Sequence, residues 1–177
     1  MTAPAGSIML AQDNARKTLS DVIAFRTWAT AADQAEALDR IYHDGLPPPA
    51  DRESYTKAEL ELYRPCALIW TDEDDGLTSE VIATNGDVYE WEDHGKIMVA
   101  LEENVPPDIA DDLAEVDLRF KNSLGLIRDG LKGLFGKAGY LACLKLDTDG
   151  PFRVRLDNAP DQGDYMIARF TMHWGRI

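Results

Sequence analysis

The sequence is poor in the residues that build metal centres and disulfide frameworks. Its 177 residues include only 2 cysteines and 3 histidines. Two cysteines are too few for a disulfide scaffold, and neither a Cys-x₂-Cys nor a His-x₃-His pair occurs, so a zinc site is not expected. We therefore predict that the protein carries no metal and no other cofactor.

Basic residues and long apolar runs are also scarce. The chain has 18 Lys and Arg against 32 Asp and Glu, which gives a formal net charge of −14. Binding to nucleic-acid phosphates or to an anionic membrane depends on Lys and Arg, so both are disfavoured. No run of about 20 apolar residues is present to span a bilayer. The first twelve residues lack the basic and apolar regions of a signal peptide, so we expect synthesis in the cytosol.

The remaining composition is that of an ordinary folded domain. Hydrophobic residues make up 45% of the chain and charged residues 28%, and the length suits one domain. We predict a single domain over residues 1–177. Within it we expect a loose N-terminal arm (1–7), helices joined by a Pro-rich connection (8–63) and an α+β core (64–177).

Hydrophobic spacing in the N-terminal third is typical of helices. Apolar residues at intervals of three and four predict one helix over 11–28. Thr30, followed three residues later by an aspartate, predicts the N-cap of a second helix over 30–43. Thr56, followed three residues later by a glutamate, is a capping box and predicts a short helix over 56–63.

The pattern then changes to that of β-strands. Asn85-Gly86 is a strong hairpin signal, because a type I′ turn needs positive φ at both central positions. His94-Gly95 indicates another turn. We predict a four-stranded antiparallel meander, with strands over 66–71, 78–84, 87–92 and 96–103.

A long helix and a C-terminal hairpin complete the predicted fold. Apolar residues from Ile109 to Leu134 recur at spacings of three and four and form a single stripe. Strands are predicted over 140–147 and 165–174, with a turn at 149–151 and a short strand over 152–156 between them. The fold class is therefore α+β, with a mostly antiparallel sheet packed by one long helix and the N-terminal helices.

No catalytic constellation is apparent. Gly136-Lys137 resembles the end of a phosphate-binding loop but lacks its first glycine and its Ser or Thr. Residues 72–76 resemble the start of a calcium loop but lack the glycine and glutamate that must follow. We interpret Cys143 and His173, on neighbouring predicted strands, as packing and surface residues. The protein is therefore not expected to be an enzyme.

Three segments follow one another in an informative order. They are a Pro-Cys-Ala-Leu-Ile-Trp strand at 65–70, a strand that runs into an acidic and Pro-rich junction at 98–108, and a strand of alternating apolar and aromatic residues at 168–174. In this order, residues 64–177 resemble the bacteriophage tail terminator proteins of lambda-type long-tailed phages. The resemblance implies a structural protein of the virion, not an enzyme. Six copies would form a ring that caps the tail tube and stops its polymerisation.

The resemblance also implies partners. These are other copies of the chain, the tail tube protein and the head–tail connector, while viral DNA passes through without specific binding and no membrane is involved. The expected location is the virion neck, after assembly in the host cytoplasm. Two alternatives stay open: another head-completion or neck connector subunit, and a small acidic inhibitor that mimics DNA. A small hydrolase is disfavoured by the few histidines.

Candidate contact residues follow from loops and from charge. Binding groups commonly lie on loops, and acids on the wall of a ring would repel DNA phosphates. The acids that begin the long helix have an alternative role as helix caps. The candidates are Asp72, Glu73, Asp74, Asp75, Asn85, Asp108, Asp111, Asp112, Glu115, Asn158 and Asp161.

Overall fold

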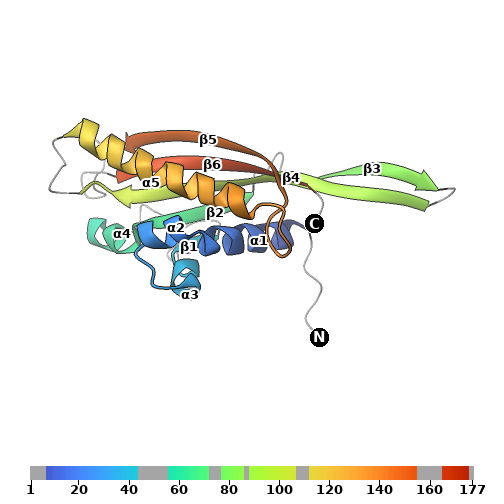
Figure 1. The fold of residues 1–177 in the computed structure, drawn as a ribbon, viewed down its shortest axis with the longest axis horizontal. Coiled ribbons are helices and arrows are strands. Elements are labelled where there is room, and N and C mark those ends of the chain that lie inside the picture. Colours follow the sequence, from blue (N-terminus) through green and yellow to red (C-terminus); the bar gives the residue numbers. More distant parts are fainter. Residues whose placement is uncertain are drawn as a thin grey trace.

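A computed structural model describes residues 7–43, 56–71, 77–85, 88–106, 112–154 and 165–175. These residues form a helical N-terminal part and then mostly strands, with one long helix between them (Figure 1). The elements are α1 (Ser7–Asp21), α2 (Ile23–Trp28), α3 (Gln34–Leu38), β1 (Ile41–His43), α4 (Lys57–Tyr63), β2 (Cys66–Thr71), β3 (Thr78–Asn85), β4 (Val88–Asn104), α5 (Leu113–Leu134), β5 (Cys143–Val154) and β6 (Tyr165–Gly175).

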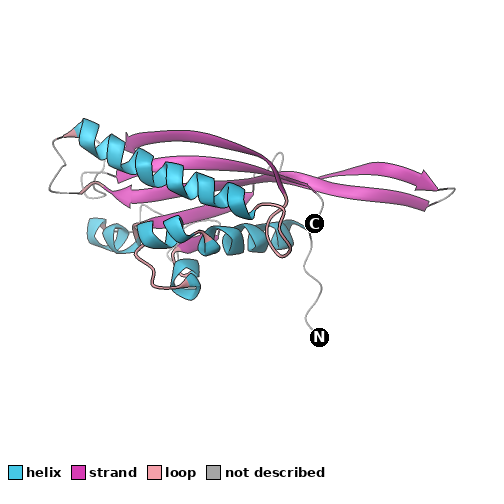
Figure 2. Ribbon diagram, in the orientation of Figure 1, coloured by secondary structure: helices cyan, strands magenta, loops and turns pink. Residues whose placement is uncertain are grey.

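The strands form one sheet. Its order is β1-β2-β4-β6-β5, and β3 also pairs with β4. Only the β1–β2 pair is parallel. The predicted α+β class, with a mostly antiparallel sheet, one long helix and N-terminal helices, is confirmed (Figure 2).

One face of the sheet carries the main core. Alternate residues of β6 are buried there, as the sequence pattern predicts. Helices α1, α2 and α5 cover this face, because their buried side chains join the same apolar cluster. The buried β6 residues are Met166, Ala168, Phe170, Met172 and Trp174.

Helix α5 confirms the predicted stripe over most of its length. Its first residue, Leu113, is 58% exposed, so among the described residues the buried stripe begins at Val116. Ile109 lies outside the described residues. The buried members are Val116, Phe120, Leu124, Ile127 and Leu131.

The single helix predicted over 11–28 is wrong, because the chain breaks into α1 and α2 at Val22. Val22 has extended backbone angles, φ −69° and ψ 114°, and its side chain is buried. A Cβ placed on Gly130 of α5 would lie 2.5 Å from Cγ1 of Val22. The break therefore fits the valine side chain against the glycine, and this tertiary contact outweighs the local helical pattern.

The second predicted helix is shorter than expected. Its N-cap is Asp33 rather than Thr30, because the Asp33 side chain accepts a hydrogen bond from the backbone N–H of Glu36 at 3.0 Å. Thr30 has a positive φ of 56° and follows the end of α2. The last predicted residues instead form β1, whose pairing with the buried strand β2 supplies partners for its backbone. The capping box of Thr56 and Glu59, which starts α4, is confirmed.

The predicted four-stranded meander is corrected to three strands. Residues predicted as a turn at His94-Gly95 lie inside one continuous strand, β4. Their pairing with β6 holds them extended, because His94 is opposite Gly175 and Gly95 is opposite Trp174. Strands β2 and β3 both pair antiparallel with β4 and follow each other along it.

The C-terminal hairpin also differs from the prediction at its turns. Strand β5 runs through the residues predicted as a turn at 149–151, and its pairing with β6 only shifts register between Asp149 and Phe152. The short strand predicted over 152–156 is therefore the end of β5. Pairing with β6 on both sides of this irregularity outweighs the local turn signal.

Candidate assembly surfaces

Most of the predicted contact residues lie outside the described residues. Asn85 is the last residue of β3 and pairs with Val88, so the hairpin connection is centred on 86–87, one residue later than predicted. Residues 86–87 are themselves outside the described part. So are eight of the candidates: Asp72, Glu73, Asp74, Asp75, Asp108, Asp111, Asn158 and Asp161.

The two remaining acids stand at the start of α5. Asp112 is the N-cap, and its Oδ1 accepts hydrogen bonds from the backbone N–H groups of Ala114 and Glu115, both at 3.1 Å. Glu115 is exposed in the first turn, where the helix dipole stabilises a negative charge. Asp112 thus has the capping role that was the alternative for this group. A place on a ring wall stays a prediction.

One part of the β-structure is a two-stranded ribbon, which consists of residues 78–85 of β3 and 88–93 of β4. It extends past the rest of the sheet (Figure 1). No other described strand pairs with it, because β4 meets β2 and β6 only from His94 onward. Residues 78–81 are exposed, including Val81 at 42%.

The ribbon carries acidic residues and no Lys or Arg. Glu80 is directly opposite Glu92, and like charges directly opposite each other destabilise a strand pair. The imidazole of His94, whose Nε2 lies 3.8 Å from Glu80 Oε1, carries a positive charge only when it is protonated. Residues 72–95 hold nine acids and no Lys or Arg. The hairpin itself was predicted from Asn85-Gly86 and is confirmed, whereas the continuous acidic run along it was not part of that prediction.

The sheet face away from α5 holds a buried ion pair. Arg64 Nε lies 3.4 Å from Glu102 Oε2, and both side chains are 2% exposed. The guanidinium also lies 3.9 Å from the centre of the Tyr165 ring and donates to Asn104 Oδ1 at 3.4 Å. These contacts hold the end of α4 against the sheet and have no reactive geometry.

Cys143 and His173 do not form a catalytic pair. Cys143 pairs with Trp174, whereas His173 pairs with Lys145 and projects to the other face. The Cys143 thiol donates to the Lys145 carbonyl at 3.2 Å, and burial raises the pKa of Cys143 to about 11. A neutral thiol is a poor nucleophile, so the interpretation of Cys143 as a packing residue fits the geometry.

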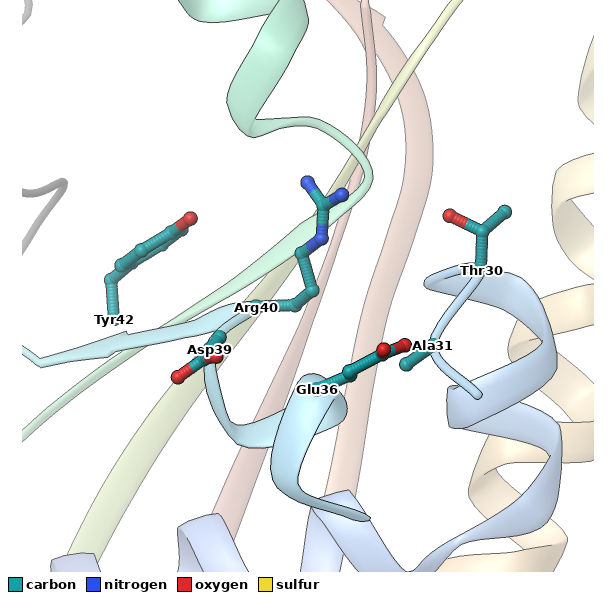
Figure 3. A pocket seen from close by; sticks show the side chains of 6 residues that line it. All are labelled: Thr30, Ala31, Glu36, Asp39, Arg40 and Tyr42. Carbon is teal, nitrogen blue, oxygen red and sulfur yellow. The ribbon is translucent and has the colours of Figure 1, made fainter. Parts of the chain in front are cut away.

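Two surface hollows border the N-terminal helices. The first, of about 310 Å³, is lined by Glu36, Arg40 and Tyr42 among others (Figure 3). Two of its charged groups are engaged, since Glu36 accepts from the Ala32 backbone N–H at 2.7 Å and Arg40 donates to the Leu62 carbonyl at 3.1 Å. Burial raises the pKa of Tyr42, so its phenol stays protonated.

The second hollow, of about 450 Å³, lies between α2, α5 and the end of β4. Trp28 Nε1 donates to Glu103 Oε2 at 2.7 Å on its floor, and Arg119 and Leu126 of α5 border it. Across the part of the chain that the structure describes, no three His, Cys, Asp or Glu side chains group as metal ligands would.

Comparison with known proteins identifies no family for this chain. No protein-family model matches the sequence, and no curated protein is significantly similar to it. None of the described helices is both long and apolar enough to cross a membrane.

Proposed function

We propose that this chain is a structural virion protein that forms a ring with other copies of itself, caps a phage tail tube, stops its polymerisation and joins the tail to the head connector. The observation that carries the proposal is the ribbon. A two-stranded β element is at best marginally stable alone in water, so a ribbon that extends past its own sheet is stabilised where another surface covers it.

The order of the elements also supports the proposal. The β2–β4 strands, the long helix α5 and the β5–β6 hairpin follow one another as the resemblance to tail terminators implies. The sheet is open, with β1 and β5 at the ends of the strand order, and open edges offer further surfaces for assembly. In this role the protein works in the virion neck and is assembled in the host cytoplasm.

Solution mass tests the proposal. We expect the purified chain, alone or with the tail tube protein, to reach the mass of a closed ring of six copies. Electron microscopy should show the ring at one end of tubes whose length has stopped increasing. A chain that stays monomeric at high concentration with the tube present contradicts the proposal. A ring that binds the connector but not the tube indicates the head-completion alternative.

The charge of the ribbon favours a second candidate, an acidic protein that mimics DNA. Carboxylates along residues 72–95 would imitate phosphates and occupy the basic surface of a DNA-binding protein. Such a protein would act as a monomer and would displace DNA from its target in a salt-dependent way. A competition experiment with a basic DNA-binding protein separates it from the ring subunit.

A further inference from the structure

We propose that the ribbon of one copy docks on the outward side of α5 of the next copy. This contact rests on the ring-forming part of the proposed function and specifies how the subunits join. Figure 1 shows the ribbon directed away from α5 of its own chain, so the contact is made between copies. Exposed apolar side chains, glycine positions and opposite charges carry the argument.

The outward side of α5 is the side opposite its buried stripe. It presents Leu118 at 63% exposure and Leu126 at 56%. These two residues are eight apart, which is about 12 Å along a helix. Strand β3 of the ribbon has 8 residues, so the ribbon is about 20 Å long or more, enough to cover both leucines.

Two glycines of α5 differ in what surrounds them. Gly130 is explained inside the chain, because Val22 occupies the space that its side chain would need. Gly125 has no such neighbour, since a Cβ built there would meet nothing within 4 Å. Glycine weakens a helix interior, and a missing side chain lets another backbone approach closely. A docked ribbon would use the space beside Gly125.

Charge makes a second copy the best occupant. Residues 118–137 hold five Lys or Arg and one acid, in contrast to the acidic run that contains the ribbon. Lys121 and Lys132 are paired with aspartates of α5 itself. Arg119 and Arg128 have no ion-pair partner among the described residues. The two arginines are nine residues apart, which places them on opposite flanks of the exposed leucines. Docking would bring one of these guanidinium groups to the repelling Glu80–Glu92 pair, and arginine suits carboxylates because it binds them through two parallel hydrogen bonds.

Reciprocal charge reversal tests the contact in the full-length chain. The ribbon variant carries Glu80→Lys and Glu92→Lys, and the helix variant carries Arg119→Glu and Arg128→Glu. Each should weaken self-association by more than about tenfold in sedimentation, because like charges would meet across the contact. A chain with all four substitutions has complementary charges again and should recover assembly. An equal mixture of the two variants should also assemble.

A matched control separates this contact from a general effect of charge. Asp13→Lys with Asp149→Lys makes the same change in net charge as the ribbon variant, but at exposed acids outside the ribbon. It should leave assembly unchanged. Circular dichroism and thermal melting establish that every variant is folded.

Four outcomes would overturn the inference. If both charge variants assemble as well as the wild type, the ring is intact but its contact lies elsewhere. A folded chain with all four substitutions that does not recover also contradicts the contact. Variants that assemble normally but no longer bind the tail tube would assign the ribbon to the tube. A wild-type chain that never assembles, even with the tube, contradicts the proposed function as well.

Discussion

The two faces of the sheet are covered in different ways. One face lies under α1, α2 and α5, and its cluster is apolar, with Phe170 and Trp174 fully or almost fully buried. The other face is covered at one end by α4, whose Leu60 meets Leu68 and Ile167. Beyond α4 it carries half-exposed and charged side chains.

One face mainly stabilises the fold, whereas the contacts on the other face mainly position α4. Apolar burial on the helix-covered face contributes most of the free energy of folding, because that contribution grows with the apolar area removed from water. On the α4 side, the Arg64–Glu102 pair is buried as well. A buried ion pair adds little net stability, since desolvation offsets the attraction, but losing one partner is costly. That pair therefore fixes where α4 sits more than it stabilises the sheet.

The largest expected effect lies on the helix-covered face. Phe120 is 3% exposed in the middle of α5, so Phe120→Ala should lower the free energy of unfolding by about 3–5 kcal/mol through lost burial and a cavity. The matched control is Leu118→Ala in the same helix, where the side chain is 63% exposed and the expected change is within about 0.5 kcal/mol. Urea denaturation measures both. Equal effects of the two substitutions would contradict the assignment of this face as the main core.

The next effect sharpens the description of the α4 side. Arg64→Met removes the guanidinium from beside the buried Glu102 carboxylate and should cost about 3 kcal/mol. Adding Glu102→Leu should recover most of that loss, because the buried charge is then gone as well. A double substitution no more stable than the single one would show that the unpaired Glu102 charge is not the cause of the loss.

The sequence predicted the parts of the fold that depend on local pattern. The capping box before α4, the alternation along β6 and the stripe of α5 depend on spacing within one element, and each was predicted. The errors fall where a distant segment outweighs a local signal. His94-Gly95 reads locally as a turn, but pairing with β6 keeps it extended, and pairing with β2 converts residues 41–43 from helix to strand.

The candidate surface was less predictable than the fold. Loop acids were chosen singly, although 32 acids make such clusters common by chance. The informative signal is the contrast between two long segments, residues 72–95 without a cation and residues 118–137 with five. The hairpin in the first segment was predicted from Asn85-Gly86, but the register that puts Glu80 opposite Glu92 comes from the pairing of β3 with β4.

A pair of glycine substitutions tests how α5 meets its neighbours. Gly130→Ala places a Cβ where Val22 already lies, so it should cost about 1–3 kcal/mol through overpacking. Gly125→Ala meets nothing within 4 Å and should stabilise the isolated chain by up to about 1 kcal/mol through higher helix propensity. Thermal melting of dilute protein measures both. If Gly130→Ala stabilised the chain and Gly125→Ala destabilised it, the packing of Val22 on α5 would be contradicted.

The smallest expected effect concerns the open part of the second face and its dependence on pH. Asp147 Oδ2 lies 2.7 Å from Lys145 Nζ and 3.0 Å from His173 Nε2. The hydrogen bond from Lys145, and then that from His173, holds the pKa of Asp147 below its ordinary value of 3.8.

A lowered pKa means that the folded chain binds the Asp147 proton less readily than the unfolded chain does. This contribution to stability is therefore complete above the ordinary pKa and is lost as the pH falls through the lowered one. Asp147→Asn should remove that part of the acid-induced loss, while Asp149→Asn, at an exposed aspartate on the same strand, should not. Urea midpoints between pH 7 and pH 2 measure the difference. Because the cluster is exposed and screened by water, the effect should be small and should shrink further in high salt. A midpoint whose pH dependence is the same in Asp147→Asn and wild type would show that these side chains do not act together in solution.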